Sequence, residues 1–301
     1  MGNVYLGFNC NCFTNRYDEP EQWTRICKEL GIKLVMFNID LIDPYWSWET
    51  QKKLCDRTLE ACAKNGVNIY ASFGGQHGHQ HYLGHPDPDV RKEAELFFQR
   101  AIKQAAYLGA KSFGTCFAIQ TVTTNSDPVQ RRAIMDDAIA SYHRLAEYGA
   151  EVGLQALAYE MTSIDRETCA TFAENDEVLA RCADMAIPMR ICLDMGHRNN
   201  GGLPEEADHC AWIRKYAKQC DVIDCQQTTK EVSCHWPFTP ENNAKGVIRG
   251  EEVMQAIQDS GADNDLLLSF ELRCAAFHPQ EDSFLKNLEQ SVAYWRQFTK
   301  N

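Results

Sequence analysis

The sequence predicts an α/β fold, a single (β/α)8 barrel that spans residues 1–301. Two observations lead to this prediction: eight short apolar segments recur at even spacing, and an amphipathic stretch with helical periodicity follows each of them. Eight such units most simply close a parallel sheet into a barrel. No Pro-, Gly- or Ser-rich linker divides the chain, and no Gly-x-Gly-x-x-Gly motif follows the first apolar segment. The open dinucleotide-binding sheet is therefore the less favoured alternative.

Each predicted strand is short and rich in β-branched or aromatic residues, as buried parallel strands are. We expect strands at residues 4–8, 33–39, 67–73, 112–118, 153–160, 188–194, 221–227 and 266–271. The predicted helices have apolar residues at helical spacing, and a glycine often follows the last turn. We expect helices at residues 20–30, 50–64, 89–108, 128–152, 175–185, 204–219, 250–260 and 280–299.

Composition narrows the class of protein. The chain has 44% hydrophobic and 24% charged residues, which is typical of a soluble globular protein. Its net charge of −12 disfavours binding to nucleic acid, and no apolar run approaches the roughly 20 residues that span a bilayer. The N-terminal residues lack the pattern of a secretory signal. The 14 cysteines include no Cys-x-x-Cys pair, so we expect reduced thiols in a cytoplasmic protein, and surface aromatic residues predict a homo-oligomer.

Polar side chains end the last four predicted strands, where a barrel places its active site. Glu160 ends the fifth strand, Asp194 the sixth and Glu271 the eighth, while Asp-Cys-Gln-Gln at 224–227 ends the seventh. Buried carboxylates in one place require protons or a cation. We therefore expect one divalent cation, held by Glu160, Asp194, Gln226 and Glu271. Oxygen-rich ligation favours Mn²⁺ or Mg²⁺. For any one of these residues, a helix N-cap or a solvated loop position is the alternative.

At these residues the sequence resembles the xylose isomerase-like TIM barrels, in particular the ketose 3-epimerases and the isomerases of small sugars or tetrulose phosphates. The resemblance covers almost the whole chain through the strand order. Its specific part is Glu160, the Leu-Asp-Met-Gly-His run at 193–197 and the Phe-Glu-Leu run at 270–272. It implies that Glu160 and Glu271 are both metal ligands and proton-transfer groups. It further implies that Asp194 is a ligand and that His197 contacts a substrate oxygen.

The seventh strand departs from the family pattern. The third ligand of the family is commonly a histidine at the end of this strand, within a His-x-His-like stretch. Here Gln226 occupies that position, and Asp224 lies two residues earlier on the same face of the strand. A glutamine oxygen can bind Mn²⁺ or Mg²⁺, although more weakly than imidazole. Either of the two residues is therefore a candidate for the third ligand.

Cationic and aromatic residues near the predicted barrel mouth indicate the substrate. Ketose epimerases of free sugars tend to carry a glutamate six residues after the one that ends strand five, where this chain has Arg166. Together with three other cationic residues it would form a rim that favours a phosphate or carboxylate on the substrate. These residues are Arg166, Lys230, His235 and Arg273. The alternative is that Arg166 pairs with Asp165 or Glu167.

One aromatic residue and one further segment are assigned to the pocket. Trp46 is expected to pack against the C–H face of a sugar, with core or oligomer packing as the alternative. The Gly- and His-rich tract at residues 74–81 is expected to be a flexible loop over the pocket in which one histidine contacts the substrate. A functional metal in this tract is the second interpretation.

These observations predict an isomerase of carbohydrate metabolism that transfers a proton next to a carbonyl group through an enediolate. The substrate would be a small ketose or aldose, free or phosphorylated, such as a tetrulose phosphate or a pentose like apiose. The residues do not distinguish 3-epimerisation from aldose–ketose isomerisation, because one set of groups serves both. A polyol or inosose-type dehydratase and a non-catalytic sugar-binding protein are the alternatives. DNA cleavage of the endonuclease IV type is disfavoured by the acidic charge.

Overall fold

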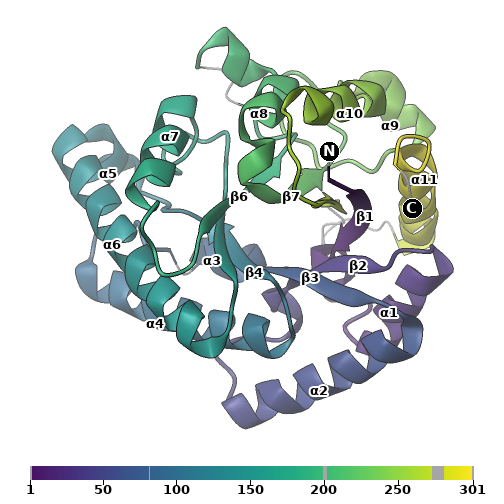
Figure 1. The fold of residues 1–301 in the computed structure, drawn as a ribbon, viewed down its shortest axis with the longest axis horizontal. Helices are drawn as coiled ribbons and strands as arrows, with labels where there is room; N and C mark the ends of the chain where they lie inside the picture. The colour runs from purple at the N-terminus through teal and green to yellow at the C-terminus, as the bar shows by residue number, and fades with distance from the viewer. Residues whose placement is uncertain (1, 81, 199–201, 273–280, 300–301) are drawn as a thin grey trace. The chain divides into compact units, whose positions relative to one another are not determined.

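The computed structural model describes residues 2–80, 82–198, 202–272 and 281–299. Its eight parallel strands form one closed barrel in chain order, which confirms the predicted fold class (Figure 1). All eight strands lie close to their expected positions. They are β1 (Val4–Asn9), β2 (Leu34–Asn38), β3 (Asn68–Phe73), β4 (Ser112–Cys116), β5 (Ala156–Glu160), β6 (Met189–Asp194), β7 (Cys220–Cys225) and β8 (Leu266–Phe270).

The long helices connect consecutive strands, as the periodicity predicts. They are α1 (Pro20–Glu29), α2 (Trp48–Asn65), α4 (Pro88–Tyr107), α6 (Pro128–Val152), α7 (Phe172–Arg181), α8 (His209–Tyr216), α10 (Gly250–Asp259) and α11 (Glu281–Trp295). The chain also forms three short helices that the periodicity did not indicate. These are α3 (Gly75–Gln80), α5 (Val122–Ser126) and α9 (Pro240–Lys245).

The chain divides into two compact units. The first consists of Met1–Phe37, Arg57–Ile69 and Leu193–Asn301. Within it β1 pairs with β2 and β8, and β7 pairs with β8. Phe8 lies opposite Phe270 in the β1–β8 register, and their rings are 5.7 Å apart. Helices α8 and α10 of this unit pack on each other (Figure 1). This unit positions the ends of β7 and β8 and the residues that follow β6.

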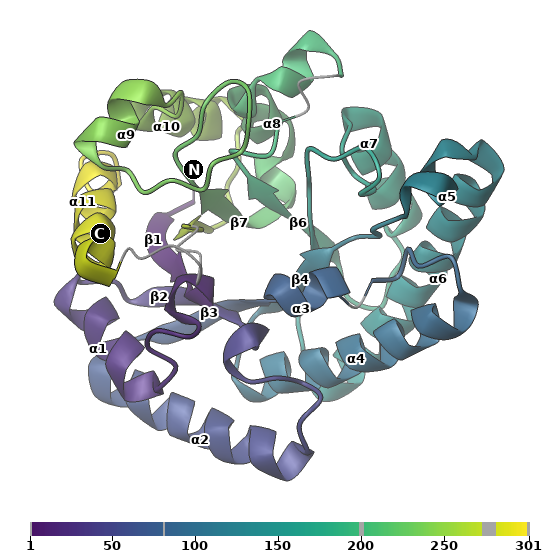
Figure 2. The ribbon, with the colours of Figure 1, turned by 180° about the vertical axis from the view of Figure 1, so that it is seen from behind.

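The second unit consists of Asn38–Asp56 and Tyr70–Cys192. Within it β4 pairs with β3 and β5, and β5 pairs with β6. Helix α4 packs against β4, helix α6 packs against β5, and the two helices lie side by side (Figure 2). Asp127 starts α6 by accepting hydrogen bonds from two backbone N–H groups of its first turn, and Gly153 ends it at a φ of 87°, which favours glycine. The cap at Gly153 ends α6 shortly before β5 begins at Ala156.

Two of the elements expected from the sequence differ in the structure. Residues 204–219 do not form one helix, because the Asp208 side chain accepts a hydrogen bond from the Cys210 N–H and starts α8 afresh. The tract at 74–81 is not a flexible loop over residues 75–80, which form α3. A Cβ on Gly78 would lie 2.5 Å from Thr115 Oγ1, so the small residues of this tract allow α3 to pack closely on β4. His81 lies outside the described residues.

Cysteine usage and helix hydropathy bear on the class of protein. Among the described cysteines none forms a disulfide, and all except Cys234 are buried. Burial raises the pKa of several of these thiols, which for Cys55 reaches about 12. None of the helices formed by the described residues is both long and apolar enough to cross a bilayer.

Candidate active site

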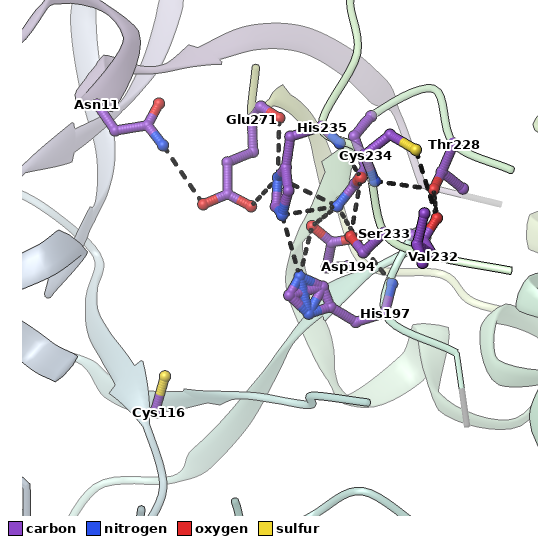
Figure 3. Close-up of polar contacts among 12 residues, drawn as sticks. Asn11, Cys116, Asp194, His197, Thr228, Val232, Ser233, Cys234, His235 and Glu271 are labelled. Carbon is purple, nitrogen blue, oxygen red and sulfur yellow. Dashed lines mark hydrogen bonds and ion pairs between the residues drawn. The ribbon is translucent and has the colours of Figure 1, made fainter. Parts of the chain in front are cut away.

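Five of the predicted site residues come together in the first unit, and four of them, Asp194, His197, His235 and Glu271, are labelled in Figure 3. Asp194 ends β6, Gln226 directly follows β7, and Glu271 directly follows β8. His197 comes three residues after Asp194, and His235 lies in the segment between β7 and α9. Asp194, His197, His235 and Glu271 each offer one ligand atom, and these four atoms lie within 4.8 Å of one another. We call these four residues the acid–imidazole group.

The contacts inside the acid–imidazole group are close. The Nε2 atoms of His197 and His235 are 3.3 Å apart, and His197 Nε2 lies 3.8 Å from Asp194 Oδ2. His235 Nδ1 lies 3.3 Å from Glu271 Oε2. The side chain of Asn11 donates a hydrogen bond to Glu271 Oε1 at 3.4 Å. The group therefore brings two carboxylates and two imidazoles to one point.

Gln226 supports this group through its side-chain amide. The amide nitrogen donates to both carboxylate oxygens of Asp194 at 2.9 Å. The amide oxygen accepts hydrogen bonds from the backbone N–H of His235 at 2.6 Å and from Ser233 Oγ at 3.0 Å. The backbone N–H of His235 can only donate, which fixes the amide oxygen toward it, and the two contacts use both lone pairs of that oxygen. In this arrangement Gln226 orients its neighbours, while the imidazole of His235 faces His197 and Glu271.

Backbone constraints hold His235 in place. Its φ of 49° lies in the left-handed region, which costs a residue with a side chain roughly 1–2 kcal/mol. Gln227 and Trp236, the neighbours of the two interacting residues, pair through backbone hydrogen bonds of 2.8 and 3.0 Å. Gly196 is required beside them, because a Cβ there would lie 2.2 Å from the amide carbon of Gln226. His235 therefore adopts a strained backbone conformation that places its imidazole in the acid–imidazole group.

The electrostatics of the group favour a cation. Burial raises the pKa of Asp194, because the charged carboxylate is removed from water. Burial acts on Glu271 in the same direction, but the charge and hydrogen bond of His235 outweigh it and lower the pKa of Glu271 to about 2. His197 Nδ1 is buried without a hydrogen-bond partner among the described residues. Two carboxylate and two imidazole donors fit a divalent metal ion, which would replace the shared protons.

The remaining predicted site residues do not belong to the four residues of the acid–imidazole group. Glu160 ends β5 in the second unit, is only 4% exposed, and lies in register with Cys116 of β4 and Cys192 of β6. Arg166 forms an ion pair with Glu167 at 3.7 Å, which is the alternative pairing expected for it. Trp46 is 45% exposed and Lys230 is exposed. Arg273 lies outside the described residues.

Arg198 is a candidate that the sequence analysis missed. It directly follows His197 yet is only 7% exposed, and its guanidinium donates to the backbone carbonyl of Thr229. Its Nε is buried without a hydrogen-bond partner among the described residues, and burial lowers the pKa of the guanidinium. The signal in the sequence was the basic residue adjoining the Leu-Asp-Met-Gly-His run. Its burial was not predictable from that position.

Comparisons with known proteins place the chain in a family. A model of the xylose isomerase-like TIM barrel matches residues 24–297. The chain belongs to this family. The D-erythrulose 1-phosphate 3-epimerase of Brucella abortus (strain 2308) is 32% identical over 295 residues, which cover 96% of this chain and 94% of the relative. The family prediction is thus confirmed, and so is the prediction of an isomerase, which the sequence left open between a sugar epimerase and an aldose–ketose isomerase.

Solved structures agree on the fold. A crystal structure of a candidate xylose isomerase from Rhodospirillum rubrum has a TM-score of 0.90 at 23% identity and covers 99% of this chain and 100% of its own. The D-psicose 3-epimerase of Clostridium cellulolyticum H10, solved with D-tagatose, has a TM-score of 0.71 at 14% identity, and each chain is covered completely. At identities of 23% and 14% the similarity shows that these proteins share the barrel fold.

A separate cluster near α8 also contains possible ligand atoms, in Asp208, His209 and Cys210. His209 is 6% exposed, and its Nε2 is buried without a hydrogen-bond partner among the described residues. Burial lowers the pKa of His209 to about 4. The folded protein therefore holds a neutral imidazole here, which has a consequence for stability.

We expect His209 to make the protein less stable in mild acid. The unfolded chain takes up a proton near pH 6.5 while the folded protein takes it up only near pH 4, so stability is lost as the pH falls through this window. The shift corresponds to about 3 kcal/mol. Urea unfolding with a chelator present at pH 7 and pH 4 measures this, with His209→Gln as the comparison. The wild type should lose about 3 kcal/mol more than the variant between these pH values, and parallel losses would contradict the assignment.

Proposed function

We propose that this chain is a divalent-metal-dependent 3-epimerase of a small phosphorylated ketose, such as a tetrulose 1-phosphate. The acid–imidazole group is the observation on which the proposal depends, because it offers a cation two carboxylates and two imidazoles at one point. The substrate class is supported by the curated relative, whose substrate is D-erythrulose 1-phosphate. The phosphate is supported by Arg198, which is buried and whose Nε has no hydrogen-bond partner within the described part of the chain.

Asp194, His235 and Glu271 would hold the cation. His197 lies at the same point and would ligate it or contact a substrate oxygen. Glu160 would join them, because the carboxyl ends of all strands of a parallel barrel form one rim. His235 thus replaces Gln226 of the sequence prediction, and the two imidazoles favour Mn²⁺ over Mg²⁺. A bound divalent cation acts as a Lewis acid that makes the proton next to a carbonyl more acidic.

Glu160 and Glu271 are the proposed proton-transfer pair. In a 3-epimerisation one carboxylate removes the proton from C3 and the other group protonates the opposite face of the same carbon. Glu271 is ionised at neutral pH, because the charge and hydrogen bond of His235 lower its pKa, so the carboxylate is free of a proton and able to accept one. Asn11 holds its other oxygen and so limits the rotation of the carboxylate. Burial of Glu160 excludes water from the second carboxylate.

Arg198 is the proposed phosphate contact. Its guanidinium is removed from water but its Nε has no hydrogen-bond partner among the described residues, which leaves a buried charged donor incompletely satisfied. A substrate phosphate would supply both the missing acceptor and the opposite charge. In barrels of this type the loops after the last strands often bind phosphate. Arg198 contacts the loop after β7, at the carbonyl of Thr229.

Glu160→Gln and Glu271→Gln test the proton-transfer pair. Glutamine keeps the size and one ligating oxygen but removes the basic carboxylate. We expect kcat to fall by about 10²–10⁴ in each variant, the usual contribution of one general acid or base. The metal content, measured by mass spectrometry of the purified protein, should fall much less. Glu241→Gln, an exposed carboxylate of α9, is the matched control and should keep wild-type turnover.

Near-normal turnover in both glutamine variants with metal still bound would contradict the assignment. The two carboxylates would then act only as ligands, and the base would have to be one of the histidines. A loss of metal that parallels the loss of turnover would equally contradict the assigned proton transfer, because the activity would follow occupancy.

Arg198→Gln tests the phosphate contact. We expect KM for a tetrulose 1-phosphate to rise about 10–100-fold, since a charge-assisted hydrogen bond contributes about 1.5–3 kcal/mol. Turnover of the unphosphorylated tetrulose should change little. Arg214→Gln removes an exposed arginine paired with Asp208 and should leave both substrates unaffected. Equal losses on the phosphorylated and unphosphorylated ketose would mean that Arg198 only stabilises the loop after β7.

A further inference from the structure

The second unit contains another cluster of possible ligands, made of His79, Cys116 and Glu167. They come from three different elements. His79 lies on α3, Cys116 ends β4 and is labelled in Figure 3, and Glu167 lies in the segment between β5 and α7. None of them belongs to the acid–imidazole group or to the proposed reaction. Nitrogen, sulfur and oxygen donors in one place are typical of a site for a thiophilic metal ion.

We propose that His79, Cys116 and Glu167 form a second metal site, which binds Zn²⁺ through a thiolate. One ligand atom of each residue lies within 4.8 Å of the others. His79 Nε2 and Cys116 Sγ are 3.6 Å apart. Tetrahedral zinc with bonds of about 2.3 Å to sulfur and about 2.0 Å to nitrogen places these two atoms about 3.5 Å apart. The observed separation therefore fits both atoms on one zinc ion.

The tautomer of His79 suits a ligand. Its Nδ1 lies 3.2 Å from the carbonyl oxygen of Gly75, one turn earlier in α3. Because a carbonyl oxygen can only accept a hydrogen bond, this contact places the proton on Nδ1. The lone pair of Nε2 is then directed at Cys116 Sγ. A backbone carbonyl that holds the far nitrogen in this way is the usual support of a metal-bound histidine.

The supporting structure holds the three residues in position. Helix α3 is packed against β4 through Gly74 and Gly78, at each of which a Cβ would lie within 3 Å of Thr115 Oγ1. The segment that carries Glu167 pairs with residues 118–120 through backbone bonds, from Thr168 N to the Ala118 carbonyl at 3.0 Å and from Gln120 N to the Arg166 carbonyl at 2.8 Å. The ligands are thus placed by a strand, a helix and an isolated β-bridge before any metal binds.

Burial and charge also favour a cation. Cys116 is 6% and Glu167 4% exposed, whereas His79 is exposed and gives access from solvent. The ion pair of Glu167 with Arg166 spans 3.7 Å, which is too long for a hydrogen bond, and the Arg166 side chain is 39% exposed. A thiolate and a carboxylate with few water contacts are stabilised by a divalent ion. Three protein ligands would leave one position open on the His79 side.

Co²⁺ in place of Zn²⁺ tests the site by spectroscopy. Thiolate-bound Co²⁺ absorbs strongly in the near ultraviolet, while the oxygen and nitrogen donors of the acid–imidazole group give no such band. We expect Co²⁺ added to the metal-free protein to produce this band, and Zn²⁺ to abolish it by displacement. Cys116→Ser should remove the band. Cys210→Ser and Cys234→Ser, which alter the cysteines next to His209 and His235 in the chain, should keep it.

His79→Gln is the companion variant, because its exposed side chain can be changed without disturbing the core. We expect the Co²⁺ affinity, measured by titration at the thiolate absorption band, to fall at least tenfold. The unfolding midpoint of the metal-free protein should be unchanged. A band that persists in Cys116→Ser, an affinity unchanged in His79→Gln, or no band at saturating Co²⁺ would overturn the proposal. In the last case the contact is an ordinary thiol–imidazole hydrogen bond. None of these outcomes depends on the proposed epimerase activity.

Discussion

The side-chain amide of Gln226 is the interaction on which the rest of the candidate active site depends. It donates to both oxygens of Asp194 and accepts from the backbone of His235, so one planar group sets the positions of a carboxylate and an imidazole. Each contact restricts the other, because the amide cannot rotate without losing both. This arrangement requires a glycine at position 196 and a left-handed backbone conformation at His235. As a result, the imidazole of His235, which belongs to no strand, lies beside Glu271.

Charge explains why such an arrangement serves function more than stability. Burying two carboxylates and two imidazoles costs free energy that apolar side chains of similar size would not cost. The opposite pKa directions of Asp194 and Glu271 show how the metal-free protein accommodates the charge: burial pushes Asp194 toward its protonated form while His235 keeps Glu271 ionised. A divalent cation would release those protons and leave both carboxylates charged. Perturbed groups of this kind concentrate at functional sites.

The strands, the long helices and the strand-end carboxylates were predictable from the sequence. Apolar runs such as 188–194 and 266–271 identify β6 and β8, and the strand ends then locate Asp194 and Glu271. The role of His235 was not predictable, because it lies nine residues beyond Gln226 in a segment without periodicity. The Gln227–Trp236 backbone pairing and the side-chain contacts of Gln226 return it to the strand end. The helix α3 was missed because glycines usually break helices, whereas here they allow close packing on Thr115. Burial of Arg198 likewise depends on tertiary contacts.

Hydrogen exchange at carbon tests the proposed reaction most directly. A tetrulose 1-phosphate is incubated with the Mn²⁺-loaded protein in D₂O, and Mn²⁺ is removed from quenched samples before NMR because it broadens the signals. The account predicts that the C3 proton is replaced by deuterium while the C3 epimer accumulates, and that a chelator stops both changes. No exchange at C3 with metal bound to the protein, or loss of water from the substrate in place of epimer, would contradict it.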